Sequence, residues 1–190
     1  MKRLSLSLTL LTLTFMSALV PTQQAQALPF LDVGPKLGYG VGILSGDNTE
    51  DIDSNTTITA FGVAGSFDVV MLQLEVNVLY LKAAYEQNIN ILGTKTTAKS
   101  EADFLAIPII GRFDISPIPM VKLALGGGYE RRFYLGDGDS PELNYMPLSV
   151  RADLKVPMIG AVGIEGRFNY QLGDDDIKNN ELMVFLHAFL

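Results

Sequence analysis

The fold of this chain is decided by two adjacent stretches, EADFLAIPIIGRFDI at 101–115 and VKLALGGGYERR at 121–132, joined by SPIPM at 116–120. In the first stretch, large apolar residues take most of the odd-numbered positions, from Leu105 to Phe113. In the second, Val121, Leu123 and Leu125 do the same. A period of two is the signature of a β-strand, so the two stretches are predicted to form one hairpin.

The second face of this hairpin indicates where it lies. Its positions hold mainly glycine and alanine, such as Ala106, Ala124, Gly126 and Gly128, with a few charges. A soluble sheet points polar residues outward and packs its large apolar residues inside. Small residues suit the interior of a narrow barrel instead, and the apolar row then meets lipid. The pattern predicts an outer-membrane β-barrel with its apolar side outward.

Composition limits the alternatives. The chain has 190 residues, no cysteine and a formal net charge of -7. This length suits one domain, and the absence of cysteine excludes disulfides and cysteine-based zinc sites. An acidic chain lacks the basic face that phosphate backbones need, so no nucleic-acid partner is expected. We also expect no cofactor and no metal site.

Residues 1–27 are predicted to be a secretory signal peptide. Lys2 and Arg3 precede an apolar run, and the small-residue site Ala25-Gln26-Ala27 follows it. This order is typical of a cleaved signal, with cleavage after Ala27. Residues 28–190 are then the barrel domain, and no apolar run in them is long enough for a membrane-spanning helix.

Eight alternating segments are expected in the barrel domain. They lie at about 33–44, 57–70, 72–86, 101–115, 121–132, 145–156, 159–172 and 181–190. Polar links at 45–56, 87–98, 133–144 and 173–180 are predicted to be long loops, and the other connections are short turns. Bacterial barrels alternate short periplasmic turns with long outer loops in this way. The fold class is therefore an all-β, eight-stranded antiparallel up-and-down transmembrane barrel.

The chain resembles a known group at three places, FLAIPIIGRFDI at 104–115, LALGGGYERR at 123–132 and VGIEGRFNYQLGD at 162–174. These segments are similar to strands of the small outer-membrane β-barrel proteins related to OmpX and the OmpA barrel. The resemblance implies insertion into the outer membrane by the barrel assembly machinery, which usually reads a terminal aromatic residue. Here Phe189 is penultimate and Leu190 is last.

Charged residues on the inner face are predicted to form one network. They are Glu75, Arg112, Lys122, Glu130, Arg151, Asp153, Glu165 and Arg167. A buried charge costs several kcal/mol unless it is paired, so opposite charges on neighbouring strands should pair. Because an eight-stranded barrel only holds its own side chains, the network should be a plug. The alternative is a narrow ion path with gating charges.

Other candidate sites are weaker. Tyr39, Tyr80, Tyr129 and Tyr170 are predicted to form an aromatic girdle at the lipid headgroups. His187 is the only histidine, and no nucleophile is marked near it, so no catalytic residue is assigned. The acidic loops hold Asp47, Glu50, Asp51 and Asp53, then Asp137, Asp139 and Glu142, then Asp174, Asp175 and Asp176. Such oxygen clusters suit Ca²⁺ or Mg²⁺, although none matches a complete calcium-loop pattern.

Three functions remain open. The first is a monomeric structural or surface-interaction scaffold whose outer loops contact lipopolysaccharide, divalent cations or an external partner. The second is a small ion or solute channel, and the third is a lipid-modifying barrel enzyme. The first is the prediction, and it makes the protein a non-enzyme of the outer membrane.

Overall fold

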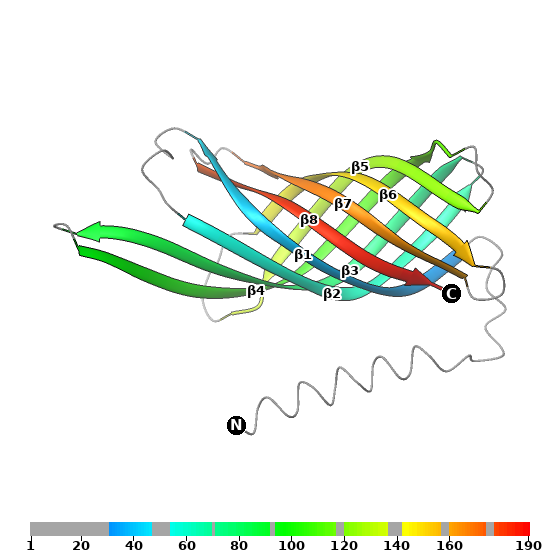
Figure 1. Cartoon of the computed structure of the whole chain (residues 1–190). Helices are drawn as coiled ribbons and strands as arrows, with labels where there is room; N and C mark the ends of the chain where they lie inside the picture. Colours follow the sequence, from blue (N-terminus) through cyan, green and yellow to red (C-terminus); the bar gives the residue numbers. More distant parts are fainter. Residues whose placement is uncertain are drawn as a thin grey trace, which may run out of the picture.

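Eight strands form one closed antiparallel barrel in the computed structural model, which describes residues 31–46, 54–69, 71–91, 94–116, 120–136, 142–156, 160–173 and 177–190 (Figure 1). The strands are β1 (Leu31–Gly46), β2 (Ser54–Val69), β3 (Leu72–Ile91), β4 (Thr94–Asp114), β5 (Val121–Tyr134), β6 (Leu143–Val156), β7 (Gly160–Leu172) and β8 (Ile177–Phe189). The predicted fold class is confirmed. In the part of the chain that is described, no helix is both long and apolar enough to cross a membrane.

The pairing is sequential, and the barrel closes between its first and last strands. Each strand pairs with the next along the chain, and β1 pairs with β8 from Lys36 opposite His187 to Gly46 opposite Ile177. Closure leaves no unpaired edge along the shared length of the strands. Both ends of the described barrel, Leu31 and Leu190, lie at one end, which we call the terminal end. The β3–β4 hairpin projects from the other, which we call the hairpin end (Figure 1).

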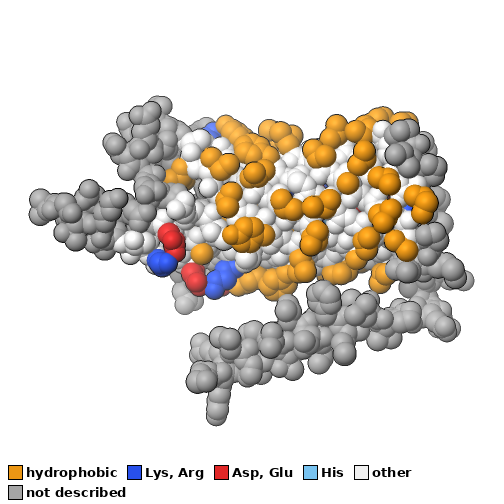
Figure 2. Space-filling model, viewed as in Figure 1, with side chains coloured by type: hydrophobic (Ala, Val, Ile, Leu, Met, Phe, Trp, Pro, Cys, Tyr) orange, Lys and Arg blue, Asp and Glu red, His pale blue; other side chains and the backbone are white. Residues whose placement is uncertain are grey.

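The two faces of each strand differ as the sequence pattern predicts. On β8 the side chains of Leu182, Val184 and Leu186 are exposed, whereas Met183 and Phe185 between them are buried. The same alternation places large apolar side chains over the outside of the barrel as a broad band (Figure 2). An apolar surface of this extent is costly in water but is satisfied by lipid. The barrel is therefore built for a bilayer.

The predicted loop at 87–98 is wrong, because most of it is strand. β3 continues to Ile91, β4 begins at Thr94, and their backbones stay paired from Gln87 opposite Ala98 to the tip. Apolar alternation is absent here because this part of the hairpin projects beyond the barrel, so neither face meets lipid. Strand pairing itself needs only backbone hydrogen bonds, which any sequence without proline supplies. The predicted loops at 45–56, 133–144 and 173–180 are likewise shortened by strand extensions.

Two prolines interrupt the ladders inside the sheet. Pairing of β3 with β4 stops at Val76 opposite Ile109 and resumes at Leu79 opposite Ala106, which leaves out Pro108. Pairing of β5 with β6 similarly skips Pro147. Proline has no N–H to donate, so each ladder loses its hydrogen bond there.

Candidate functional site

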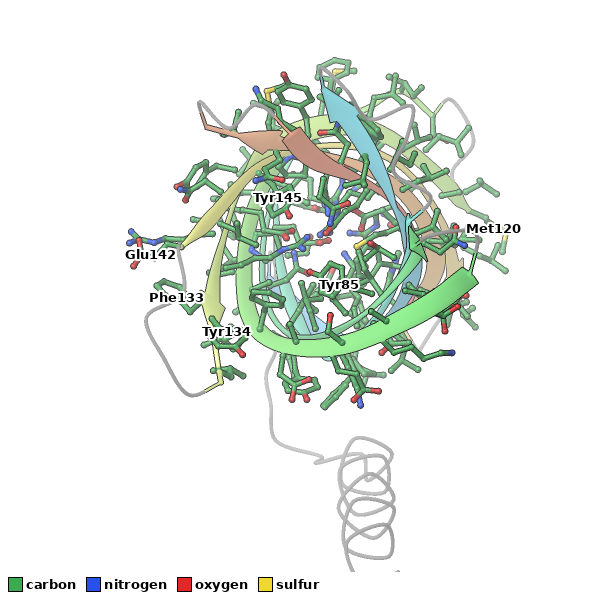
Figure 3. All side chains as sticks on the ribbon, turned by 90° about the vertical axis from the view of Figure 1, so that its left-hand side faces the viewer. Tyr85, Met120, Phe133, Tyr134, Glu142 and Tyr145 are labelled. Carbon is green, nitrogen blue, oxygen red and sulfur yellow. The ribbon has the colours of Figure 1, made fainter. Side chains whose placement is uncertain are left out.

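Charged side chains fill much of the barrel interior. All eight residues predicted for the interior network are buried, and Glu75 and Glu165 are completely inaccessible to solvent. A view into the barrel shows side chains crossing the lumen, with Tyr85 and Tyr145 pointing inward near the hairpin end (Figure 3). The site is therefore the lumen itself.

Two carboxylates and two cations form the centre of this network. The Nζ atom of Lys36 lies 2.7 Å from Glu75 Oε1 and 2.5 Å from Glu165 Oε2. Arg112 joins the same two carboxylates, at 3.0 Å from Glu75 Oε2 and 2.8 Å from Glu165 Oε1. These residues come from β1, β3, β4 and β7, so three of the four ion pairs connect strands that are not neighbours in the sheet, and only Arg112 and Glu75 lie on adjacent strands.

Toward the hairpin end, the network continues through two arginines. Arg167 bonds Glu165 at 2.9 Å and reaches Glu130 at 3.4 Å. Arg132 lies 2.5 Å from Glu130 and donates two hydrogen bonds of 2.5 Å to the carboxylate of Glu181. A bidentate arginine–carboxylate pair is among the strongest polar contacts in proteins.

Toward the terminal end, Arg151 extends the network. It lies 2.5 Å from Glu75 and 2.7 Å from Asp153. It also donates to Gln73 at 3.3 Å, and Gln73 in turn donates to Asp68 at 2.9 Å. Asp68 pairs with Lys122 at 2.5 Å. One connected set of polar contacts therefore runs from the terminal end almost to the hairpin end.

Aromatic rings on the inner face of β8 support the cations. The guanidinium of Arg167 lies 4.4 Å from the centre of the Phe185 ring, and that of Arg151 lies 4.6 Å from the centre of Phe189. The guanidinium of Arg132 similarly stacks at 4.0 Å on Tyr145 of β6. Such stacking stabilises a desolvated cation without another charge.

The network is balanced in charge within the described residues. Its cations are Lys36, Arg112, Lys122, Arg132, Arg151 and Arg167, and its carboxylates are Asp68, Glu75, Glu130, Asp153, Glu165 and Glu181. Four of these, Lys36, Asp68, Arg132 and Glu181, were not among the predicted site residues. Alternation along the strands could have found all four, because each falls on an inward row of its strand.

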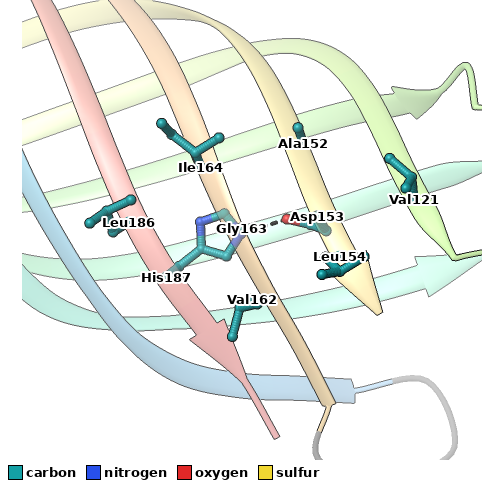
Figure 4. Close-up of a pocket in the computed structure, with 9 residues that line it drawn as sticks. All are labelled: Val121, Ala152, Asp153, Leu154, Val162, Gly163, Ile164, Leu186 and His187. Carbon is teal, nitrogen blue, oxygen red and sulfur yellow. Dashed lines mark hydrogen bonds and ion pairs between the residues drawn. The ribbon is translucent and has the colours of Figure 1, made fainter. Parts of the chain in front are cut away.

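His187 belongs to the same interior. Its Nε2 atom lies 2.6 Å from Asp153 Oδ1, and its ring packs against Phe189. Figure 4 shows this pair beside Gly163 of β7. A Cβ atom at Gly163 would lie 2.1 Å from Asp153 Oδ1 and 2.5 Å from His187 Nε2, so the absent side chain makes room for the contact. The pair ties β6 to β8 across β7.

A second part of the interior is apolar, which the sequence pattern did not predict. Ile58, Leu79, Leu81, Phe104 and Phe185 are buried and pack into one cluster with smaller neighbours. These residues come mainly from β2, β3 and β4, and Tyr85 and Tyr134 pack against them. Sequence reasoning expected large apolar residues on an inner row only at 181–190, which includes Phe185, whereas this wall of the lumen also carries them on β2, β3 and β4.

The four predicted girdle tyrosines lie on β1, β3, β5 and β7. Tyr39 and Tyr129 are exposed, and Tyr80 and Tyr170 are half-buried. The hydroxyl of Tyr129 bonds Asn144 Oδ1 at 2.5 Å, and the ring centre of Tyr80 lies 5.0 Å from that of Phe61. Their level in a membrane stays a prediction.

The other predicted sites fall mainly outside the described residues. These are the signal peptide at 1–27 and all of the named loop acids except Glu142. Among the residues that are described, no group of three or more histidine or acidic side chains is arranged to hold a metal ion.

Fold and site together define an eight-stranded transmembrane β-barrel, apolar outside and occupied inside by a charge-balanced network. No protein-family model matches the chain, and no curated protein sequence matches it. Among solved structures, it is similar to the outer membrane protein OprG from Pseudomonas aeruginosa, with a TM-score of 0.57 and 10% identity over 84% of this chain and 93% of OprG.

Two further structures are matched with lower TM-scores. Neisserial surface protein A has a TM-score of 0.46 and 12% identity over 83% of this chain and 96% of its own. Ail, the attachment invasion locus protein of Yersinia pestis, has a TM-score of 0.42 and 15% identity over 85% of this chain and 99% of its own. At such identities the likeness concerns the fold alone. The fold is that of the small outer-membrane barrels, as the sequence resemblance predicts.

Proposed function

We propose that the protein is a surface-interaction scaffold of the outer membrane, with a closed lumen and a binding surface at its hairpin end. In the orientation that we propose for the membrane, the terminal end of the barrel faces the periplasm. The hairpin end and the acidic loops face outward, toward lipopolysaccharide, divalent cations or an external partner. Delivery by a signal peptide at 1–27, insertion by the barrel assembly machinery and a monomeric state belong to the same proposal.

The observation that carries this proposal is the filled interior. The twelve charged side chains of the network are joined to one another, so none of them is set aside for a passing ion. An eight-stranded barrel is only wide enough for its own side chains. A lumen of this kind supports the strands instead of conducting.

The projecting β3–β4 hairpin supports a role at the surface. The last backbone hydrogen bond from the β5 side of the barrel to β4 runs from Leu135 N to Asp103 O, at 2.9 Å. Beyond it, residues 98–102 of β4 pair with β3 and with no other described strand, which leaves this part of the hairpin edge open (Figure 1). Open strand edges bind extended segments of other proteins through backbone hydrogen bonds.

Conductance in a planar bilayer tests the closed lumen. We expect no resolved single-channel steps from the wild-type protein. A variant with alanine at Lys36, Glu75, Arg112 and Glu165 keeps the charge balance but removes the centre of the plug, so it should show small steps and serves as the control for insertion. Regular steps from the wild type would replace the scaffold with the channel.

An enzymatic role has less support. His187 is bonded to Asp153 through Nε2, and the ring is packed inside the barrel. A histidine held in this way contributes to the internal network. We therefore propose no catalytic residue.

A further inference from the structure

Charge on the outward rows of the strands is confined to one end of the barrel. The outward rows of the described strands carry Lys82, Glu86, Lys99, Glu101, Asp103, Arg131, Glu142 and Lys178, all toward the hairpin end. Toward the terminal end, the outward rows of the described strands hold no charged residue. Figure 2 shows the coloured acidic and basic side chains at the hairpin end, beyond the apolar band. The two ends are therefore suited to different lipid headgroups.

One group of these residues has the composition of a phosphate site. We call it the Arg131 patch, and it consists of Tyr129, Arg131 and Phe133 on β5 with Glu142 and Asn144 beside them. Arg131 and Asn144 are opposite each other in the β5–β6 ladder. The guanidinium of Arg131 pairs with Glu142 and lies 5.1 Å from the centre of the Phe133 ring.

The patch is open on its outer side. The side chains of Arg131 and Glu142 are 44% and 53% exposed, and Figure 3 shows Phe133 and Glu142 pointing away from the barrel. Its polar groups are thus presented sideways, next to the apolar band, instead of upward into solution. A ligand here would be a molecule lying in the membrane beside the barrel.

We propose that the Arg131 patch binds a phosphorylated glycolipid of the outer leaflet, together with a divalent cation. Arginine matches the geometry of phosphate through its planar donors. The neighbouring Glu142 carboxylate would repel a phosphate alone, but Mg²⁺ or Ca²⁺ can join the two oxygen ligands. Tyr129 and Asn144 then supply hydrogen bonds to sugar hydroxyls, and Phe133 packs against the Arg131 guanidinium on the side away from the apolar band.

A similar arrangement recurs on β3 and β4. Lys82 follows Tyr80 on the outward row of β3, as Arg131 follows Tyr129 on β5. The Nζ atom of Lys82 lies 2.6 Å from Glu101 Oε2. Two tyrosine–cation–carboxylate groups at the same end indicate a repeated headgroup site instead of a single chance pair.

This inference rests on the proposed function, which places the hairpin end of the barrel at the outer leaflet. Measuring lipid binding to the mature protein in detergent tests the inference. Native mass spectrometry would compare bis-phosphorylated lipid A with its dephosphorylated form, in Mg²⁺ and in EDTA. We expect the phosphorylated lipid to bind at least tenfold more tightly in Mg²⁺, and Arg131→Gln to weaken it about tenfold, which is the scale of one charge-assisted contact. Glu142→Gln should remove the difference between Mg²⁺ and EDTA.

Lys99→Gln is the matched control. Lys99 is also exposed and paired with an acid, Glu86, but it lies on the projecting part of the hairpin, so its loss should leave lipid binding unchanged. Equal affinity for the two lipids, or equal effects of Arg131→Gln and Lys99→Gln, would overturn the proposal. So would Arg131-dependent binding of a soluble acidic polysaccharide without binding of the lipid. Bilayer conductance is independent of these results, so a failure of the closed-lumen scaffold would be recognised separately.

Discussion

Replacing Lys36 by methionine is expected to lower the free energy of unfolding by about 3–5 kcal/mol, the cost of breaking a buried ion pair from one side. Lys36 is inaccessible to solvent and contacts two carboxylates that are equally inaccessible, Glu75 and Glu165. Its loss leaves the interior with one uncompensated negative charge. Removing both signs of charge together is far less costly, because no unpaired ion remains buried.

Urea titrations of the protein folded in lipid vesicles measure this effect. Lys122→Met is the matched control, because the partner of Lys122, Asp68, is 32% exposed and the pair is partly solvated. This control should cost only about 1 kcal/mol. The double variant Lys36→Met/Glu165→Gln should recover most of the stability lost in Lys36→Met. A double variant less stable than Lys36→Met would contradict the charge-balanced network.

Leu148→Arg is expected to destabilise the barrel by about 2–4 kcal/mol in vesicles, although its side chain is half-exposed. Leu148 lies on the outward row near the middle of β6, between Gly127 of β5 and Phe168 of β7. In a water-soluble barrel, an arginine at a position this exposed would hardly change the free energy of unfolding. The cost arises only if lipid surrounds this row.

Asn144→Arg tests the same strand and the same row near the hairpin end. There the headgroups supply water and phosphate, so the expected cost is about 0–1 kcal/mol. A depth-dependent difference between the two positions supports the apolar band as the membrane-spanning surface. If Leu148→Arg were as mild as Asn144→Arg, the outward row would face water.

The sequence was sufficient for the barrel because lipid outside and side chains inside impose a strict period of two. That period fixed both the number of strands and the face on which Glu75, Arg112 and Glu165 lie. It failed at 87–98, where strands project beyond the membrane and the alternation is lost although the pairing continues.

The contacts of the network were beyond sequence reasoning for a different reason. Lys36 lies among glycines on β1, and its partners come from β3 and β7, so only the closed barrel brings them together. The apolar wall around Leu79 and Phe104 also escaped prediction, because an interior row of large apolar residues has the same composition as a lipid-facing row. Alternation gives the face of each residue, but the contacts across the lumen depend on how the strands tilt and close.

The central claim, a closed barrel embedded in the outer membrane by its apolar exterior, is tested most directly by electrophoretic mobility. The protein would be extracted in detergent from separated membrane fractions and run unheated and boiled. We expect it in the outer-membrane fraction, with a clear mobility shift on boiling, because the closed sheet resists detergent until heat unfolds it. A protein that is freely soluble and runs at one mobility in both samples would contradict the account.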